Sequence, residues 1–592
     1  MQQFSIRVGT ALALLCGTIP AQTTSLVSRS GLSDWNIQSL RPSISADGRF
    51  VAFESTASDL VANDLNNFRD IFVYDRRTGL TTLASRSSSG VQANERSSAP
   101  SISADGRFVA FESLADNLVP VDSNALSDVF VHDRLTGATV LASRSSAGVQ
   151  GNNWSNAPSI SGNGRWVAFA SAASSFVPND PSGIPDVYLH DLQTSTTEFV
   201  SMSSTGVHGD FGGHSPSLSF DGRFVAFTSW STNLVGGDGN GELDVFVRDR
   251  LNGTTELVSR SSLGVQGNDD SIDPSISADG RFVAFSSISV NLIQSDANGA
   301  LTDVFLRDRQ LGTTRLVSTD SNGVQGNIHA LRPSISADGG SIAFDSNSTN
   351  LIPNDANGND FDVYVHHWQS GTTELVSQSS DGVQGDSDSS TPSISGDGRF
   401  VAFHGDASNL VPGDGVILEF DIFLRDAAPS LSTYCAGDGS SGPCPCGNAG
   451  AAGHGCENSA STGGAILAFA GAAKLSADTL VLTSSGELPS ALSIVLQGDV
   501  PIAPTIYGDG LRCVGGALKR LYVRNAVGGV LTAPQGADPT ISERSMALGS
   551  AIPAGASRYY QTYYRDGNGT FCPSPPGNTW NVSNGIEAVW GY

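Results

Sequence analysis

Lysine is almost missing from this sequence, and charged residues of any kind are scarce. Only 15% of the 592 residues are charged, against about 25% in an average globular domain. Lys474 and Lys519 are the only lysines, and 58 acidic residues outnumber 32 basic ones, which gives a net charge of −26. Because phosphate neutralisation supplies most of the affinity for nucleic acids, this composition excludes a general nucleic-acid binder.

Long apolar runs are missing too, except at the start of the chain. Arg7 precedes the apolar stretch Val8–Leu15 and then Ile19-Pro20-Ala21, which is the order of a secretory signal peptide. The stretch is too short to span a bilayer, and a lipid anchor on Cys16 would need a small residue where Leu15 stands. We predict a signal peptide over residues 1–21 and a secreted or periplasmic, cell-envelope protein without a membrane span.

Cysteine is absent between Cys16 and the last 160 or so residues. An even number of cysteines in an exported segment favours disulfides, although their pairing cannot be read from the sequence. A zinc knuckle that uses His454 is the alternative, but the spacings differ from the common C-x-x-C pairs. The predicted disulfide cysteines are Cys435, Cys444, Cys446, Cys456, Cys513 and Cys572.

Near-identical repeats fill the region between these segments. The segment Pro42–Phe53 (PSISADGRFVAF) recurs at intervals of 58 or 59 residues. Each repeat holds four strand-like pieces, and an Asp-Gly turn typical of hairpins joins the first two. Four antiparallel strands with a period above about 40 residues predict one blade of a β-propeller. The prolines that begin the seven copies are Pro42, Pro100, Pro158, Pro216, Pro274, Pro333 and Pro392.

The two ends of the repeat array complement each other. The last repeat stops after its third strand, Phe420–Leu424, whereas Thr23–Ser28 matches the fourth-strand segment Thr254–Ser259. The first strand of the mature chain is therefore predicted to complete the last blade, which removes edges that invite aggregation. We predict an all-β chain with a seven-bladed β-propeller at 22–428, closed by this N-terminal strand, and a linker at 429–434.

Residues 435–592 are expected to form a smaller, disulfide-braced, β-sandwich-like domain. Segments such as Leu492–Leu496 and Arg520–Val523 have the composition of strands separated by Gly and Pro turns, and no amphipathic helix is expected. Six aromatic residues would form either a carbohydrate platform or part of the core, and their bulk favours the core. They are Tyr559, Tyr560, Tyr563, Tyr564, Trp580 and Trp590.

The repeat resembles the WD40-like (PD40) repeat of TolB-type propellers. In that family a Pro-x-x-Ser-x-Asp-Gly-x-x-hydrophobic-Ala-Phe pattern precedes a strand that ends in Asp and a Thr-Gly turn. The match covers roughly residues 23–428 but departs from TolB itself: Ile44 and Leu218 replace the usual Trp, seven repeats replace six, and the N-terminal α/β domain is absent. The resemblance implies an exported propeller without implying TolB's partners. The Cys-containing C-terminal region is similar to modules of exported proteins of planctomycete-like bacteria, which implies no activity.

The loops between second and third strands carry acidic residues at regular positions. The Asp-x-Asn pattern resembles the start of a calcium loop, in which oxygens surround the ion. The alternative, that Asp and Asn hydrogen-bond the loop backbone, is favoured because the acid at the twelfth position lies beyond an intervening strand. Two further repeats keep Asp180 with Asp186 and Asp414 with Asp421. The candidate calcium ligands are Asp64, Asn66, Asp70, Asp122, Asn124, Asp128, Asp238, Asn240, Asp244, Asp296, Asn298, Asp303, Asp355, Asn357 and Asp362.

The loops that join successive repeats share a face with these acidic loops in a four-stranded meander. Long loops on a rigid scaffold are where binding residues gather. Aromatic and histidine side chains there would stack on a sugar, clamp a peptide or fill gaps between blades. The candidate partner-binding residues are Trp35, Trp154, Phe211, His214 and His329.

No catalytic motif is complete. The segment 213–217 lacks the last Gly of a nucleophile elbow, and near-identical repeats argue against residues in unequal catalytic roles. We expect a monomeric, non-enzymatic propeller that binds a protein or glycan partner through its long-loop face, with calcium as the one cofactor considered. The alternatives are a carbohydrate-active hydrolase or lyase with carboxylates on the same face and a structural envelope protein.

Overall fold

The computed structural model describes residues 23–28, 38–62, 64–178, 180, 183–412, 419–427, 432–434, 444, 449–451, 454–470, 473, 478–507, 510–552, 556–566 and 580–590. The predictions made for the signal peptide, Trp35, Asp414, Cys435, Cys446 and Cys572 lie outside these residues. The chain divides into two compact units, Gln22–Ala427 and a C-terminal unit that starts at Ala428. Each is described by itself.

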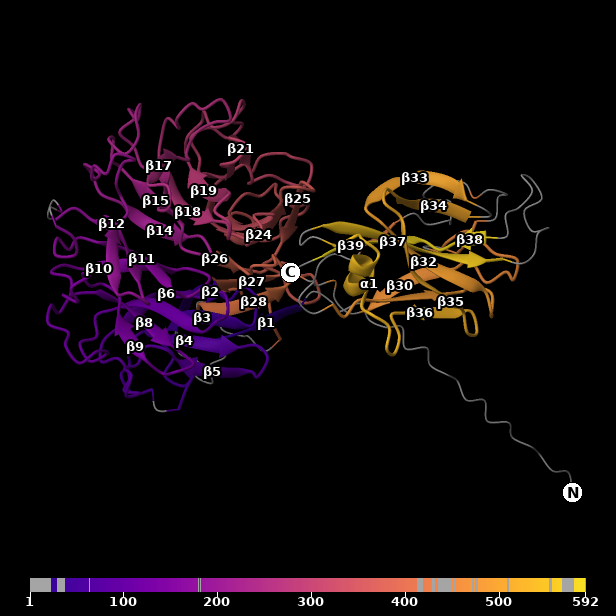
Figure 1. Ribbon diagram of the computed structural model, residues 1–592, viewed down its shortest axis with the longest axis horizontal. Helices are drawn as coiled ribbons and strands as arrows, with labels where there is room; N and C mark the ends of the chain where they lie inside the picture. Colours follow the sequence, from indigo (N-terminus) through magenta and orange to yellow (C-terminus); the bar gives the residue numbers. More distant parts are fainter. Residues whose placement is uncertain are drawn as a thin grey trace, which may run out of the picture. The chain divides into compact units, whose positions relative to one another are not determined.

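Seven four-stranded antiparallel sheets make up the first unit (Figure 1). We number them as blades 1 to 7 in chain order. In blades 1 to 6 the strands follow one another along the chain, and blade 7 has the order β1-β28-β27-β26. The blades consist of β2 (Ser39–Ile44), β3 (Phe50–Ser55), β4 (Asp70–Asp75) and β5 (Leu80–Leu83); β6 (Ser97–Ile102), β7 (Phe108–Ser113), β8 (Asp128–Asp133) and β9 (Thr139–Leu141); β10 (Ser155–Ile160), β11 (Trp166–Ser171), β12 (Asp186–Asp191) and β13 (Thr196–Phe199); β14 (His214–Leu218), β15 (Phe224–Ser229), β16 (Asp244–Asp249) and β17 (Thr254–Leu257); β18 (Ser271–Ile276), β19 (Phe282–Ser287), β20 (Asp303–Asp308) and β21 (Thr313–Leu316); β22 (Ala330–Ile335), β23 (Ser341–Ser346), β24 (Asp362–His367) and β25 (Thr372–Leu375); and β26 (Ser389–Ile394), β27 (Phe400–Gly405) and β28 (Asp421–Asp426) with β1 (Thr23–Leu26).

The blades follow one another around a closed ring. The first strand of each blade contacts the first strand of the next, from β2 and β6 to β22 and β26, and β26 contacts β2. Strand β1 pairs with β28, with Thr24 opposite Arg425. Just beyond β1, Ser28 Oγ donates to Asp421 Oδ1 at 2.6 Å. The predicted all-β propeller with N-terminal strand closure is confirmed.

The second and third strands are apolar at successive positions because both faces of each blade are covered. Val51, Ala52 and Phe53 of β3 have no exposed surface. Val51 and Phe53 pack with Phe400 of blade 7, whereas Ala52 packs with Val109 of blade 2. Alternate residues therefore face opposite neighbours, and the core lies between blades.

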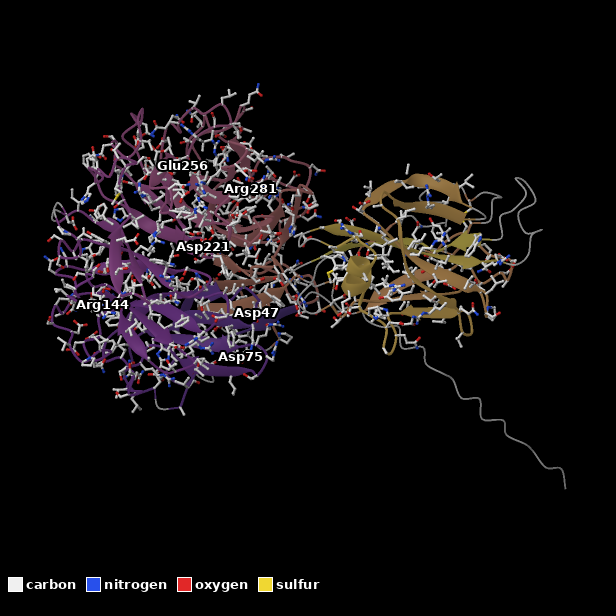
Figure 2. All side chains as sticks on the ribbon, in the orientation of Figure 1. Asp47, Asp75, Arg144, Asp221, Glu256 and Arg281 are labelled. Carbon is white, nitrogen blue, oxygen red and sulfur yellow. A yellow bond between two sulfur atoms is a disulfide. The ribbon has the colours of Figure 1, made fainter. Side chains whose placement is uncertain are left out.

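An arginine–aspartate pair repeats at the tight turns of the blades. In blade 1, Arg49 Nη2 lies 2.7 Å from Asp75 Oδ2. The equivalent pair is present in blades 2, 3, 4, 5 and 7. Asp75 and Arg281, from two of these pairs, are labelled in Figure 2. Blade 6 has a hydrogen bond of 2.9 Å between Ser341 and His367 at this place. The regularity of these pairs indicates a structural role, in which each pair connects the second strand of a blade to the third.

Two sheets of the C-terminal unit share one core. One sheet has the order β29-β39-β37-β32-β35 with β38 beside β37, the other is β30-β31-β36, and β33 and β34 form a hairpin. Leu482 and Leu531 of the smaller sheet pack with Val495 and Tyr560 of the larger one, as in the β-sandwich-like domain that was predicted. The elements are β29 (Ser432–Tyr434), β30 (Ile466–Ala470), β31 (Val481–Ser485), β32 (Leu492–Gly498), β33 (Val500–Tyr507), β34 (Gly510–Gly515), β35 (Lys519–Asn525), β36 (Val530–Ala533), α1 (Ile541–Ala547), β37 (Ser557–Arg565), β38 (Trp580–Val582) and β39 (Gly585–Val589).

The described cysteines are oxidised. A disulfide joins Cys444 to Cys456, and Cys513 is disulfide-bonded as well. His454, the histidine of the zinc alternative, is hydrogen-bonded through Nδ1 to the Gly464 carbonyl at 2.8 Å. The disulfide prediction is confirmed for these three cysteines, and a zinc knuckle built on Cys444 and Cys456 is excluded.

Some features of this unit differ from the prediction. Helix α1 was not expected, yet Thr540 and Glu543 form a capping box that starts it. Strand β29 lies within the predicted linker at 429–434 and pairs with β39. Tyr560, Tyr564 and Trp590 are fully buried, so they belong to the core rather than to a carbohydrate platform. Within the described residues, no helix is long and apolar enough to cross a bilayer.

Candidate functional site: the long-loop face of the propeller

The connections of each blade divide between two faces. In blade 1, short turns at 45–49 and 76–79 alternate with longer connections at 56–69 and 84–96. Because successive strands run in opposite directions, the two long connections of a blade lie at the same end. This end is the long-loop face, and the candidate residues that the structure describes lie on it.

A glutamine side chain bridges the two acidic residues of the loop in blade 1. Gln92 Nε2 donates to Asp64 Oδ1 at 2.6 Å and to Asp70 Oδ2 at 2.8 Å. Asn66 Nδ2 donates to the same Asp70 oxygen at 2.7 Å, and Ser85 Oγ donates to the other oxygen at 2.5 Å. Both oxygens of Asp70 are therefore occupied, and Gln92 links the loop after β3 to the connection after β5. We call this arrangement the glutamine clamp.

The glutamine clamp does not fit a calcium ion. Gln92 Oε1 accepts from the Leu65 amide at 3.2 Å, which fixes the amide with its N–H groups toward the carboxylates. Calcium needs about six to eight oxygen ligands with free lone pairs, and here an N–H donor occupies the place where the carboxylates converge. The geometry favours the alternative in which Asp and Asn shape the loop by hydrogen bonding.

Four further blades repeat the clamp. Gln150, Gln266, Gln325 and Gln384 bridge the acidic residues of their own loops. Burial raises the pKa of Asp70 and of its counterparts in blades 4, 5 and 6 to about 6. Hydrogen bonds from the glutamine amides and serine hydroxyls thus take the place of water around these buried carboxyl groups. The remaining candidate calcium ligands lie in these clamps: Asp122, Asn124, Asp128, Asp238, Asn240, Asp244, Asp296, Asn298, Asp303, Asp355, Asn357 and Asp362.

Blade 3 lacks the clamp. His208 stands at the glutamine position, and its ring stacks on Phe199 with the centroids 3.9 Å apart. The Tyr188 hydroxyl donates instead to Asp180. Burial raises the pKa of Asp186 in this blade to about 7. The acidic loop of blade 3 is therefore held by an aromatic pair and a phenol in place of an amide.

Exposed aromatic side chains lie near the point where the chain enters blade 4. Phe211 is 59% and Trp230 43% exposed. The His214 ring packs edge-on against Trp230 with the centroids 5.5 Å apart. The Phe211 amide donates to Ser231 Oγ at 3.1 Å, directly after Trp230. We call Phe211, His214 and Trp230 the aromatic patch.

The backbone beneath the aromatic patch is fixed in place. Gly212 has a φ of +69°, and a Cβ at this position would lie 2.0 Å from the Pro185 carbonyl oxygen. The Gly213 amide donates to the same oxygen at 2.7 Å. Asp210 accepts from the Thr232 amide at 2.9 Å and from its hydroxyl at 3.0 Å. The patch is therefore preorganised, which lowers the entropic cost of binding.

The other described candidates lie apart from this patch. Trp154 is half-buried where the chain enters blade 3, and its carbonyl accepts from Ser171 Oγ at 2.8 Å. His329 precedes blade 6 and accepts through Nδ1 from the Thr302 amide at 3.1 Å. The partial burial of both residues fits the gap-filling alternative that the sequence left open.

Trp230 was missed by the sequence-based prediction. It follows Ser229 directly, at the position that Thr56 occupies after Ser55 in blade 1. An alignment of the repeats against each other contains the signal, because Trp230 is the one aromatic residue at a position that holds Thr56, Leu114, Ala172, Ile288, Asn347 and Asp406 in the other repeats. Its proximity to Phe211 became visible only in the fold.

No protein-family model and no curated protein matches the chain. Among solved structures, TolB from Acinetobacter baumannii is 14% identical with a TM-score of 0.32, over 58% of this chain and 63% of that one, so this chain spans less than two thirds of its length. A putative TolB from Agrobacterium tumefaciens is 15% identical with a TM-score of 0.32, over 60% and 97%. Hydrazine synthase from Kuenenia stuttgartiensis is 14% identical with a TM-score of 0.34, over 66% and 97%. These values carry no inference about activity, and the resemblance to modules of planctomycete-like bacteria finds no support.

Proposed function

We propose that this chain is an exported, non-enzymatic propeller that binds a glycan or protein partner through its long-loop face, with the aromatic patch as the contact. The observation that carries the proposal is the pair of exposed rings, Phe211 and Trp230, on a fixed backbone. Aromatic side chains provide a large contact area at low entropic cost, and they stack on sugar rings and apolar peptide side chains.

The regular carboxyl groups of this face support a binding protein over a hydrolase or lyase. In five blades their oxygens accept hydrogen bonds from a glutamine amide and a serine hydroxyl. A general acid or base has to reach the proton of a substrate with a free oxygen. The clamped carboxyl groups are occupied within the protein instead.

The test compares the wild-type chain with the double variant Phe211→Ala/Trp230→Ala on a glycan array and on a phage-displayed peptide library. Both side chains are exposed, so the variant should fold, and its melting temperature checks this. Any ligand found for the wild-type chain is expected to bind the double variant at least about tenfold more weakly.

Phe68→Ala is the matched control, since Phe68 is an aromatic residue 39% exposed on the long loop of blade 1. It should bind like the wild-type chain. An absence of any ligand on both arrays, or equal affinity of the double variant, contradicts the proposal. Cleavage of a glycan in the same assay replaces it with the hydrolase or lyase alternative.

A further inference from the structure

The inner strand of every blade is interrupted by one residue in a left-handed conformation. The residue before each repeat proline has a φ of 47° to 52°, at the point where the pairing with the second strand shifts register. Residues with a Cβ rarely adopt this conformation. All seven blades share the backbone, yet the side chains differ: Arg41, Ala99, Ala157, Ser215, Asp273, Arg332 and Thr391.

A buried carboxylate holds the arginine of blade 6. Arg332 Nη1 lies 2.8 Å from Asp345 Oδ2, and the Arg332 side chain is 46% exposed whereas that of Asp345 has no exposed surface. The Thr391 amide, at the equivalent position of blade 7, donates to the same oxygen at 2.9 Å. Asp345 therefore orients Arg332, whose side chain remains partly exposed to solvent.

Blade 1 repeats this arrangement with a weaker pair. Arg41 Nη1 lies 4.0 Å from Glu54 Oε2, and the Arg41 side chain is 55% exposed. Glu54 receives a closer arginine, since Arg69 Nη1 lies 3.0 Å from Oε1. The Ala99 amide of blade 2 donates to Glu54 Oε2 at 2.8 Å. Arg41 is thus the less neutralised of the two arginines.

His404 of blade 7 lies between the two arginines around the ring. Burial and the charges of Arg332 and Arg41 lower its pKa to about 4, so the imidazole is neutral at pH 7 and adds no charge. Its Nε2 is within 3.0 Å of Ser390 Oγ. Asp345 Oδ1 and His404 Nδ1 are buried without a hydrogen-bond partner. Blades 6, 7 and 1 therefore hold two buried polar atoms without a hydrogen-bond partner, near the two solvent-exposed arginine side chains.

From this arrangement we infer that Arg41 and Arg332 form an oxyanion-binding site on the inner strands, toward the long-loop end, for a carboxylate or phosphate group of a ligand. Each guanidinium offers N–H donors in the fork geometry that such groups accept. The equivalent positions in blades 2, 3 and 4 are Ala99, Ala157 and Ser215, whose small side chains place no competing charge there. The site is independent of the aromatic patch.

A third acidic residue, besides Glu54 and Asp345, lies near the two arginines. Asp273 occupies the equivalent position in blade 5, beside Arg332, and burial raises its pKa. The Asp273 carboxyl group interacts electrostatically with Arg332 and so competes with an incoming anion. Replacement of Asp273 by asparagine should therefore strengthen anion binding, which is a change that mere loss of structure would not produce.

The test is isothermal titration with citrate and, separately, with inorganic phosphate, at pH 7 and constant ionic strength. The wild-type chain should bind at least one of them saturably below about 20 mM. Arg41→Ala and the paired variant Arg332→Gln/Asp345→Asn should each weaken binding about tenfold or more, and Asp273→Asn should strengthen it about threefold. The stronger of the two anions identifies whether the ligand group is a carboxylate or a phosphate.

Arg77→Ala is the control, because Arg77 is an exposed arginine in a tight turn of blade 1. It removes the same charge from the opposite face and should leave binding unchanged. The inference is overturned if neither anion binds saturably, if Arg41→Ala binds like the wild-type chain, or if Arg77→Ala loses as much affinity as Arg41→Ala. Near-ultraviolet circular dichroism of each variant verifies that the propeller is folded.

Discussion

Removal of the Ser28 hydroxyl group, just beyond the ring-closing strand β1, should lower the stability of the propeller. Ser28 Oγ donates to Asp421 Oδ1 at 2.6 Å and accepts from the Ile422 amide at 2.8 Å. Ser28→Ala removes a hydrogen bond to a carboxylate and leaves the amide of fully buried Ile422 without its side-chain partner. Together these losses should lower the free energy of unfolding by about 3 kcal/mol. For a domain of this size the melting temperature should fall by about 4 °C.

Ser85→Ala is the matched comparison within blade 1. Ser85 Oγ donates to Asp70 and accepts from the Ile71 amide, so the same contacts are lost between strands that are neighbours along the chain. Urea titration should give similar losses for both variants. Hydrogen exchange should differ, since only Ser28→Ala should accelerate exchange of β1. If Ser28→Ala costs less than about 1 kcal/mol while Ser85→Ala costs about 3 kcal/mol, β1 does not close the ring in solution.

Further predictions concern pH, calcium and one turn. Burial raises the pKa of Asp70 to about 6, so the folded chain binds this proton more tightly and stability should rise as the pH falls from about 7 to about 4. A hydrogen bond from arginine lowers the pKa of Asp75 to about 2, so that pair's stabilisation is lost as the pH falls further. The melting temperature should therefore peak near pH 4 to 5, at about the crossover of the two effects, and a steady rise up to neutral pH contradicts this. Calcium added after a chelator should move the melting temperature by less than about 1 °C, and a shift of several degrees contradicts the glutamine clamp. Gly48→Ala should cost about 3 kcal/mol, because its Cβ would lie 2.0 Å from the Phe400 ring, whereas Gly79→Ala, which meets nothing within 4 Å at a φ of +71°, should cost about 1 kcal/mol. Equal urea midpoints for the two alanine variants contradict the packing of blade 7 on blade 1.

The propeller was predictable because the repeats supply an alignment within one chain. The interval between Pro42 and its copies gave the period, and the surplus segment Thr23–Ser28 gave the closure. The C-terminal unit has no such repetition. Its helix α1 was missed although the sequence contains the capping pair Thr540 and Glu543, because a helix of seven residues has too few turns for a clear apolar period.

The site was less predictable than the fold for a physical reason. The acidic loops were recognised, but the decisive partner, Gln92, lies in a different connection and reaches them only across the blade. The Asp-x-Asn pattern alone does not show whether a glutamine amide or a cation lies between the carboxyl groups. Trp230 and Phe211 likewise come from separate connections, and the hydrogen bond from the Phe211 amide to Ser231, the residue after Trp230, links the two connections.

The tight-turn face and the long-loop face of the propeller differ in how closely the blades resemble one another. At the tight turns the Arg49–Asp75 pair is repeated in all blades but the sixth, which is what a structural role requires. At the long-loop end the residue before each proline ranges from alanine to arginine on an unchanged, strained backbone. Glycine would adopt this conformation at less cost, yet none of the seven residues is glycine. The backbone is kept while the side chain at that position changes from blade to blade, and this variation supports our proposal that binding takes place at the long-loop end of the propeller.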